Sequence, residues 1–209
     1  CTACVLRQTA KAPVMGRGSS SARIVLVGEA PGTEEDKAGR PFVGAAGRIL
    51  SDLIDRAELF EDELWITNAV ACWPPPSSGS GSRNGKPPVP CVEACRDLHL
   101  LRQLEAIGPK VVVALGAYAA GSLLRLSPHK VKMADTISVP VGVDPWRHPI
   151  MPVAMLGPVF YLPQTGATVP LLAAYHPAYL DRLGYWQDKD SAAAQATVAT
   201  LVGARRLAG

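Results

Sequence analysis

The sequence has no long apolar stretch and few aromatic residues. None of its apolar runs approaches the roughly 18–20 residues that cross a bilayer, and the segment from Cys1 to Arg17 has no apolar stretch of signal-peptide type. We therefore expect no membrane partner and an intracellular, cytoplasmic location. Aromatic residues make up 6% of the chain and hydrophobic residues 48%. The core must therefore consist mainly of Ala, Val, Leu and Ile.

The chain also lacks a strong charge of either sign. Its 21 basic and 18 acidic residues give a formal net charge of +3. A basic balance of this size is compatible with a nucleic-acid partner but does not require one. A length of 209 residues is enough for one well-buried α/β domain and short for two. We predict a single domain over residues 1–209.

Cysteine is sparse and odd in number. The five cysteines are Cys1, Cys4, Cys72, Cys91 and Cys95, and an odd count without a secretion signal argues against a disulfide scaffold. One Cys-x2-Cys pair and two distant cysteines supply four thiolates, the number that a tetrahedral zinc or a [4Fe–4S] cluster uses. The spacing does not choose between these two metals, and scattered buried thiols are the alternative.

Apolar runs that alternate with helical patterns predict the fold. Strands are predicted at residues 22–28, 64–70, 110–115 and 169–174. Helices are predicted at 45–59, 92–107 and 116–126, and from Asp188 and Asp190 to Arg205-Arg206. Weaker strand patterns stand at 136–143 and 159–162, and residues 74–90 form a Pro/Gly/Ser-rich loop. The alternation predicts an α/β fold with three αβα layers and a central, mostly parallel four-stranded sheet.

Polar residues stand where three of the predicted strands end. They are Gly28-Glu29, Thr67-Asn68 and His176. Ligands of open α/β sheets bind beyond the carboxyl ends of the strands. These residues are therefore expected to converge on one site.

Three motif blocks in one order carry a resemblance to a known family. The blocks are Gly28-Glu-Ala-Pro-Gly32 with Glu35-Asp36, Gly39-Arg-Pro-Phe-Val-Gly44 and Gly47; Thr67-Asn-Ala-Val-Ala-Cys72-Trp-Pro-Pro75; and Tyr175-His-Pro-Ala178. Together they resemble the blocks of the family-4 uracil-DNA glycosylases. Each block is weak alone, since a Gly-rich turn after a strand also occurs in phosphate and nucleotide loops. Their order and the cysteine arrangement are similar to the family over roughly residues 1 to 185.

The resemblance implies an enzyme that flips uracil out of DNA and hydrolyses its N-glycosidic bond, leaving an abasic site. Glu29 would stabilise the cationic sugar or orient the attacking water. His176 would donate a hydrogen bond to uracil O2 as negative charge develops there. Structural alternatives are a turn-capping carboxylate for Glu29 and a packing role for His176.

The resemblance also implies a set of substrate-binding residues. Phe42 would stack on the base, and the amide of Asn68 matches N3–H and O4 of uracil but not cytosine. Alternative roles are core packing for Phe42 and turn capping for Asn68. Discrimination at the C5 side would involve Glu35, beside the open space that Gly32 leaves. The full set is Gly28, Ala30, Gly32, Glu35, Phe42 and Asn68.

Family resemblance selects the metal as well. It implies a structural [4Fe–4S] cluster on Cys1, Cys4, Cys72 and Cys95, with Cys91 spare. Such a cluster would attach the amino terminus beside the DNA-facing loop.

Two segments are expected to contact DNA. The first is the loop after Cys72, and the second resembles the family's wedge loop, which fills the gap that the flipped base leaves. The apolar residues of this second segment, which include Leu183, are also compatible with the start of a covering helix. Ala71 replaces a lysine that is common in the family, and basic loop residues would compensate. The predicted contacts are Pro74, Pro75, Arg83, Lys86, Tyr179, Leu180 and Arg182.

Three other functions compete with uracil excision. They are a DNA-damage-binding module of the same fold with weak turnover, a small iron–sulfur electron carrier, and a glycosylase for a modified uracil or another deaminated base. The presence of Glu29, Asn68 and His176 together argues against the binding module. An electron carrier would gain nothing from the Glu-Ala-Pro-Gly and His-Pro loops, which argues against the second function. The preferred partner is uracil-containing DNA, single- or double-stranded, bound by a monomer.

Overall fold

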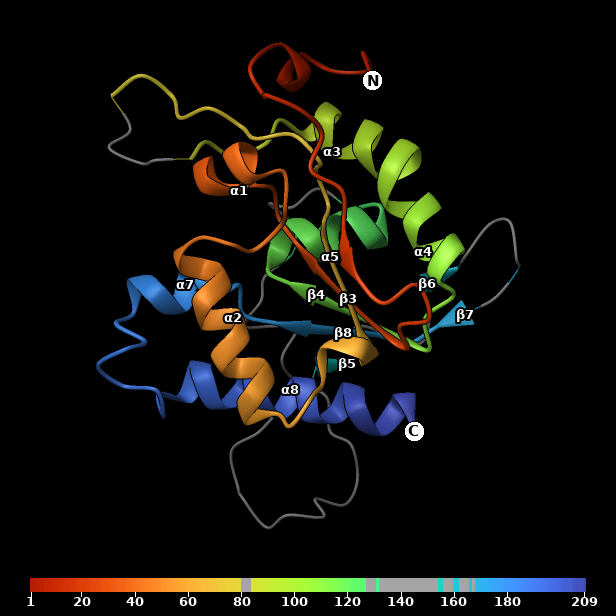
Figure 1. Ribbon diagram of the computed structural model, residues 1–209, viewed down its shortest axis with the longest axis vertical. Coiled ribbons are helices and arrows are strands. Elements are labelled where there is room, and N and C mark those ends of the chain that lie inside the picture. Colours follow the sequence, from red (N-terminus) through yellow and green to blue (C-terminus); the bar gives the residue numbers. More distant parts are fainter. Residues whose placement is uncertain (80–83, 127–130, 132–153, 156–159, 162–165, 167) are drawn as a thin grey trace.

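A six-stranded sheet crosses the centre of the computed structural model, with helices on both faces (Figure 1). The structure describes residues 1–79, 84–126, 131, 154–155, 160–161, 166 and 168–209. The strand order is β1-β3-β2-β4-β8-β5. The strands are β1 (Arg17–Gly18), β2 (Ile24–Gly28), β3 (Leu64–Asn68), β4 (Val111–Leu115), β5 (Ala154–Met155) and β8 (Leu171–Ala174).

The inner four strands are parallel, as predicted. β2 pairs with β3 and β4, and β4 pairs with β8. The two edge strands β1 and β5 are antiparallel and were not predicted. Each has only two residues, too few to give an alternating pattern in the sequence. The predicted αβα class is confirmed, and the sheet is wider than the four predicted strands.

The last predicted strand divides at a proline. β7 (Thr168–Val169) pairs with β6 (Phe160–Tyr161) in a separate two-stranded sheet, and β8 begins after Pro170. Proline has no N–H to donate, which favours a break between two ladders. The weak pattern at 159–162 thus contains β6, whereas the pattern at 136–143 lies outside the described residues.

The helices at 45–56, 117–124 and 192–208 follow predicted segments with shifted ends, and the helix predicted at 92–107 is divided into three parts. The helix at 33–38 was not predicted, and the one at 177–182 was only the alternative to a wedge loop. They are α1 (Thr33–Ala38), α2 (Ala45–Arg56), α3 (Val89–Cys95), α4 (Leu101–Ile107), α5 (Ala117–Leu124), α7 (Pro177–Arg182) and α8 (Ala192–Ala208). Short 3₁₀ turns are η1 (Val5–Gln8) and η2 (Glu61–Glu63), and a π-helical turn, η3 (Arg96–Leu100), joins α3 to α4. α8 begins later than predicted, and Asp190, which was expected at its start, forms an ion pair of 2.7 Å with Arg56.

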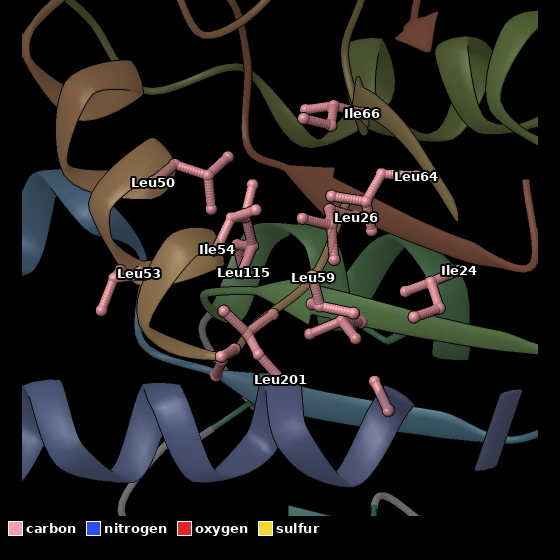
Figure 2. Packing of buried hydrophobic residues seen from close by; sticks show 14 of the residues in the cluster. Ile24, Leu26, Leu50, Leu53, Ile54, Leu59, Leu64, Ile66, Leu115 and Leu201 are labelled. Carbon is pink, nitrogen blue, oxygen red and sulfur yellow. The ribbon is translucent and has the colours of Figure 1, made fainter. Parts of the chain in front are cut away.

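The sheet separates two apolar cores by strand alternation. Ile24 and Leu26 of β2 face the core that contains α2 and α8, whereas Val25 and Val27 face the core that contains α4 and α5. Figure 2 shows the first core, where Leu50, Leu53 and Ile54 of α2 and Leu201 of α8 lie with the sheet residues. Because both faces are covered, β2 is buried along its whole length.

A third, smaller core joins the amino terminus to α3. Leu6 and Ala10 pack there with Val70, Ala71 and the adjoining cysteines. The segment after β3 is thereby held between the start of the chain and α3. Among the residues described, no helix has both the length and the apolar character that a bilayer crossing requires.

Candidate functional site

The carboxyl ends of β2 and β3 bring Gly28 and Asn68 together. The two residues are register partners in the parallel ladder. A Cβ placed on Gly28 would lie 2.4 Å from Oδ1 of Asn68 and 2.5 Å from Cζ of Phe42. Glycine is therefore required here by close approach. The buried amide of Asn68 and the buried ring of Phe42 both come close to this backbone position.

Phe42 is held in an unusual backbone conformation by Glu35. Its φ of 53° lies in the left-handed region, which costs about 1–2 kcal/mol for a residue with a side chain. Oε1 of Glu35 accepts hydrogen bonds from the N–H groups of Val43 (3.0 Å) and Gly44 (2.8 Å). Oε2 accepts from the N–H of Gly32 at 2.9 Å. The buried carboxylate thus joins the start of α1 to the Phe42 loop and stabilises the strained residue.

His176 follows β8 and begins α7. Its Nδ1 accepts a hydrogen bond from the N–H of Ala178 at 3.1 Å, so the neutral ring carries its proton on Nε2. Nε2 is buried and has no hydrogen-bond partner in the described part of the chain. Burial, together with the charges of Lys86 and Arg182, lowers the pKa of His176 to about 4. The ring lies 6.0 Å from that of Phe42. The site therefore holds a neutral, unused N–H donor.

Glu29 directly follows β2 and lies near the same two cations, Lys86 and Arg182. Lys86 Nζ donates to both of its carboxylate oxygens, at 3.2 and 3.1 Å. Burial raises the pKa of Glu29, and Lys86 and then Arg182 oppose that shift. The Lys86 ammonium also lies 5.1 Å from the centre of the Tyr118 ring, on α5. Lys86 was predicted as a DNA contact, and the structure brings it to Glu29.

The predicted metal ligands gather in part. Cys72 and Cys95 are buried in the third core with Cys91, Cys4 packs against them, and Cys1 is exposed. Burial raises the pKa of Cys72, and that of Cys95 to about 11. Within the ranges that the structure describes, no three His, Cys, Asp or Glu side chains are arranged to hold a metal ion. The donor set suits a thiolate-bound metal in kind, because three of its four thiols, Cys4, Cys72 and Cys95, share the third core.

The remaining predicted residues divide between surface and core. Pro75, Tyr179 and Arg182 are exposed, whereas Arg83 lies outside the described residues. Pro74 is buried, and Leu180 is 1% exposed in the core that contains α2. Because these two side chains are buried, they are not accessible to DNA. The prediction that Pro74 and Leu180 contact DNA is therefore wrong for this structure. Ala30 is half-buried and packs against the third core.

Two site residues were missed in the sequence. Tyr118 carries the ring beneath Lys86, and the N–H of Ala178 sets the His176 tautomer. Tyr118 follows the carboxyl end of β4 by three residues. That position, at the same edge of the sheet as Glu29, was the available signal.

The chain is similar in sequence to known uracil-DNA glycosylases. The profile of the uracil DNA glycosylase superfamily matches residues 15–201. The chain is similar to the type-4 uracil-DNA glycosylase of Archaeoglobus fulgidus, with 36% identity over 179 residues that cover 85% of this chain and 76% of the relative. The Pyrobaculum aerophilum enzyme of the same name is 32% identical over 178 residues, 85% and 78% of the two chains. The Thermotoga maritima enzyme is 44% identical over 119 residues, 57% and 58% of the two chains.

Proposed function

The chain belongs to the type-4 uracil-DNA glycosylases of the uracil-DNA glycosylase superfamily, and we propose that it excises uracil from DNA with Glu29, Asn68 and His176 at the reacting base. The resemblance seen in the three motif blocks is thereby confirmed. The assignment of individual residues is our proposal, and it depends on the geometry of the site.

The observation that carries the proposal is the unused N–H of His176. Departing uracil takes the bonding electrons of the N-glycosidic bond, and the charge is shared by its carbonyl oxygens. A buried N–H donor that is already oriented stabilises such an anion without the cost of reorganising solvent. The Ala178 N–H fixes Nδ1 as the acceptor, so Nε2 must be the donor. With its pKa at about 4, the ring acts at neutral pH as a hydrogen-bond donor and not as an acid.

Glu29 acts on the sugar side of the same bond. As the bond between C1′ and uracil N1 breaks, positive charge develops on the sugar, and a carboxylate stabilises it. A water oxygen then bonds to C1′, and Glu29 accepts the proton that this water loses. The products are free uracil anion, later protonated by solvent, and an abasic sugar.

Asn68 and Phe42 select the base. The Asn68 amide offers one acceptor and one donor group, complementary to N3–H and O4 of uracil. Phe42 supplies an apolar ring surface for stacking. Glu35 contributes by holding the Phe42 loop, since its oxygens already accept three backbone N–H groups.

A [4Fe–4S] cluster would be held by Cys1, Cys4, Cys72 and Cys95. Support comes from the type-4 family and from the gathering of three of these thiols at the third core. When bound, the cluster would supply structural attachment of the amino-terminal segment, and hydrolysis needs no redox change. DNA contacts are proposed for the exposed Pro75, Tyr179 and Arg182 and for Arg83.

The test is an excision assay on oligonucleotides that contain uracil, cytosine, thymine, hypoxanthine or 5-hydroxymethyluracil. We expect release from uracil-containing strands. Asn68→Asp should reduce uracil excision about tenfold or more and allow some attack on cytosine, because a mismatched hydrogen bond costs about 1–3 kcal/mol. Full uracil activity in Asn68→Asp would show that Asn68 does not read the base. Preference for a modified uracil would identify a different substrate of the same site.

A further inference from the structure

Lys86 is a loop residue whose ammonium reaches the carboxylate of Glu29. Nζ lies 3.2 Å from Oε1 and 3.1 Å from Oε2, so one cation engages both oxygens. The same ammonium lies over the face of Tyr118, 5.1 Å from the ring centre. A contact to a DNA phosphate, which was the expectation for this lysine, does not account for either interaction.

The backbone before Lys86 is held in place. The Gly85 N–H donates to the carbonyl of Pro74 at 2.9 Å. Oδ1 of Asn84 accepts from the indole N–H of Trp73 at 2.9 Å. Both bonds attach the end of the long loop to the segment that follows β3. The position from which Lys86 extends is therefore held by the segment Trp73-Pro74, which follows β3.

Glu29 is surrounded by groups from several elements. Lys86 comes from the segment before α3, Arg182 from α7 and Tyr118 from α5. Lys86 and Arg182 both favour the ionised form of Glu29, against its burial. Burial, and then the charge of Glu29, raise the pKa of Tyr118. His176 belongs to the same site, and with its pKa lowered to about 4 by burial its ring is neutral near pH 7. Among the described residues, only Lys86 forms an ion pair with Glu29.

We propose that Lys86 is a positioning residue for Glu29, which it keeps ionised and oriented for attack on the sugar. The inference rests on the proposed role of Glu29. Burial alone favours a protonated carboxyl, which neither stabilises a sugar cation nor accepts a proton from water. The Lys86 side chain is 68% exposed, so the ion pair adds little to folding stability. Its effect is on the protonation and orientation of one carboxylate.

The test is the pH profile of single-turnover uracil excision in Lys86→Met. Loss of the cation should move the acid limb of the profile to higher pH. On the acid side we expect about a three- to tenfold loss relative to the wild type, falling to less than twofold on the plateau. Lys86→Arg, which keeps the positive charge, should have the acid limb of its pH profile at the wild-type position. Lys110→Met is the matched control, because it removes an equal charge from an exposed position before the amino end of β4.

Two results would overturn the inference. An equal loss at every pH, with a shallower dependence of binding on salt, would make Lys86 a phosphate contact only. A uniform loss with an unchanged limb and unchanged salt dependence would make its role structural. A second readout needs no activity: the ¹³C carboxyl signal of Glu29, assigned with Glu29→Gln, should titrate at higher pH in Lys86→Met. If the wild type excises no uracil, the proposed function fails while this titration still tests the ion pair.

Discussion

Replacing Gly28 by alanine tests the geometry of the site most directly. The added Cβ would lie 2.4 Å from Oδ1 of Asn68 and 2.5 Å from the ring of Phe42. Ordinary contacts of a Cβ begin at 3.4 Å, so the Asn68 oxygen and the Phe42 ring must each move by about 1 Å, the differences between 3.4 Å and 2.4 or 2.5 Å. Neither group moves freely. Asn68 ends a buried strand, and the loop of Phe42 is hydrogen-bonded to Glu35.

The expected magnitude follows from that displacement. A misplacement of about 1 Å in a catalytic site costs about 100-fold in rate, and overpacking a buried position costs about 1–3 kcal/mol of stability. Gly28→Ala should therefore lower the single-turnover rate of uracil excision about 100-fold while the protein remains folded. Thermal unfolding of the same preparation separates the two effects.

Gly108→Ala provides the control for Gly28→Ala. Gly108 ends α4 with a φ of 61°, and a Cβ added there would meet no other group within 4 Å. Alanine at this position should cost about 1 kcal/mol through backbone strain alone and leave excision unchanged. If Gly28→Ala keeps its activity within about threefold of the control, Asn68 and Phe42 do not act together on the base.

Three further outcomes follow from the structure. Glu35→Gln should destabilise the protein by about 1–3 kcal/mol in urea unfolding, because its amide nitrogen would face a backbone N–H donor; unchanged stability would refute the role of Glu35 in holding the loop. Cys72→Ser should lose the broad absorption at about 400 nm of a [4Fe–4S] protein, and Cys91→Ser should keep it. Purification with stoichiometric zinc and no visible absorption would contradict the cluster. Denaturing electrophoresis should show repeated turnover and no protein–DNA adduct, because loop 77–90 has no histidine and the amine of its Lys86 is bound to Glu29 as an ammonium. A stable shifted band would contradict capture of the sugar by water.

The strand ends were predictable because their sequence signals are local. Runs of Val, Ile and Leu closing on Gly28 and Asn68 placed both residues at one edge of the sheet, and His176 followed by the same reasoning. Helix α7 was ambiguous, since Tyr179 and Leu180 suit a wedge as well as a covering helix. The structure separates them, with Leu180 in the core and Tyr179 39% exposed. The two residues are neighbours in a helix of six residues. A segment this short has no periodic pattern that would predict which of them points into the core.

The contacts of Glu35 and Lys86 were not predictable from pattern. Glu35 lies in a helix whose first turn also contains Glu34 and Asp36, and nothing local distinguishes the three. Its role arises because the chain returns with Phe42 in a left-handed conformation and presents two N–H groups to the same carboxylate. Lys86 likewise meets Glu29 across 57 residues of sequence. Both contacts depend on how loops fold back on the sheet edge.

Burial acts in opposite directions on the two groups proposed for catalysis. It disfavours the charged form of each, which raises the pKa of Glu29 and lowers that of His176. For His176 this result is useful as it stands, because a neutral ring with a fixed tautomer is the required donor. For Glu29 it is harmful, because only the carboxylate can act on the sugar. The charge of Lys86 opposes the rise in the pKa of Glu29, and the same charge lowers the pKa of His176 further. A single lysine at Glu29 thus favours the working form of both groups, which is the physical reason for a cation at this position in a site that must also receive a polyanion.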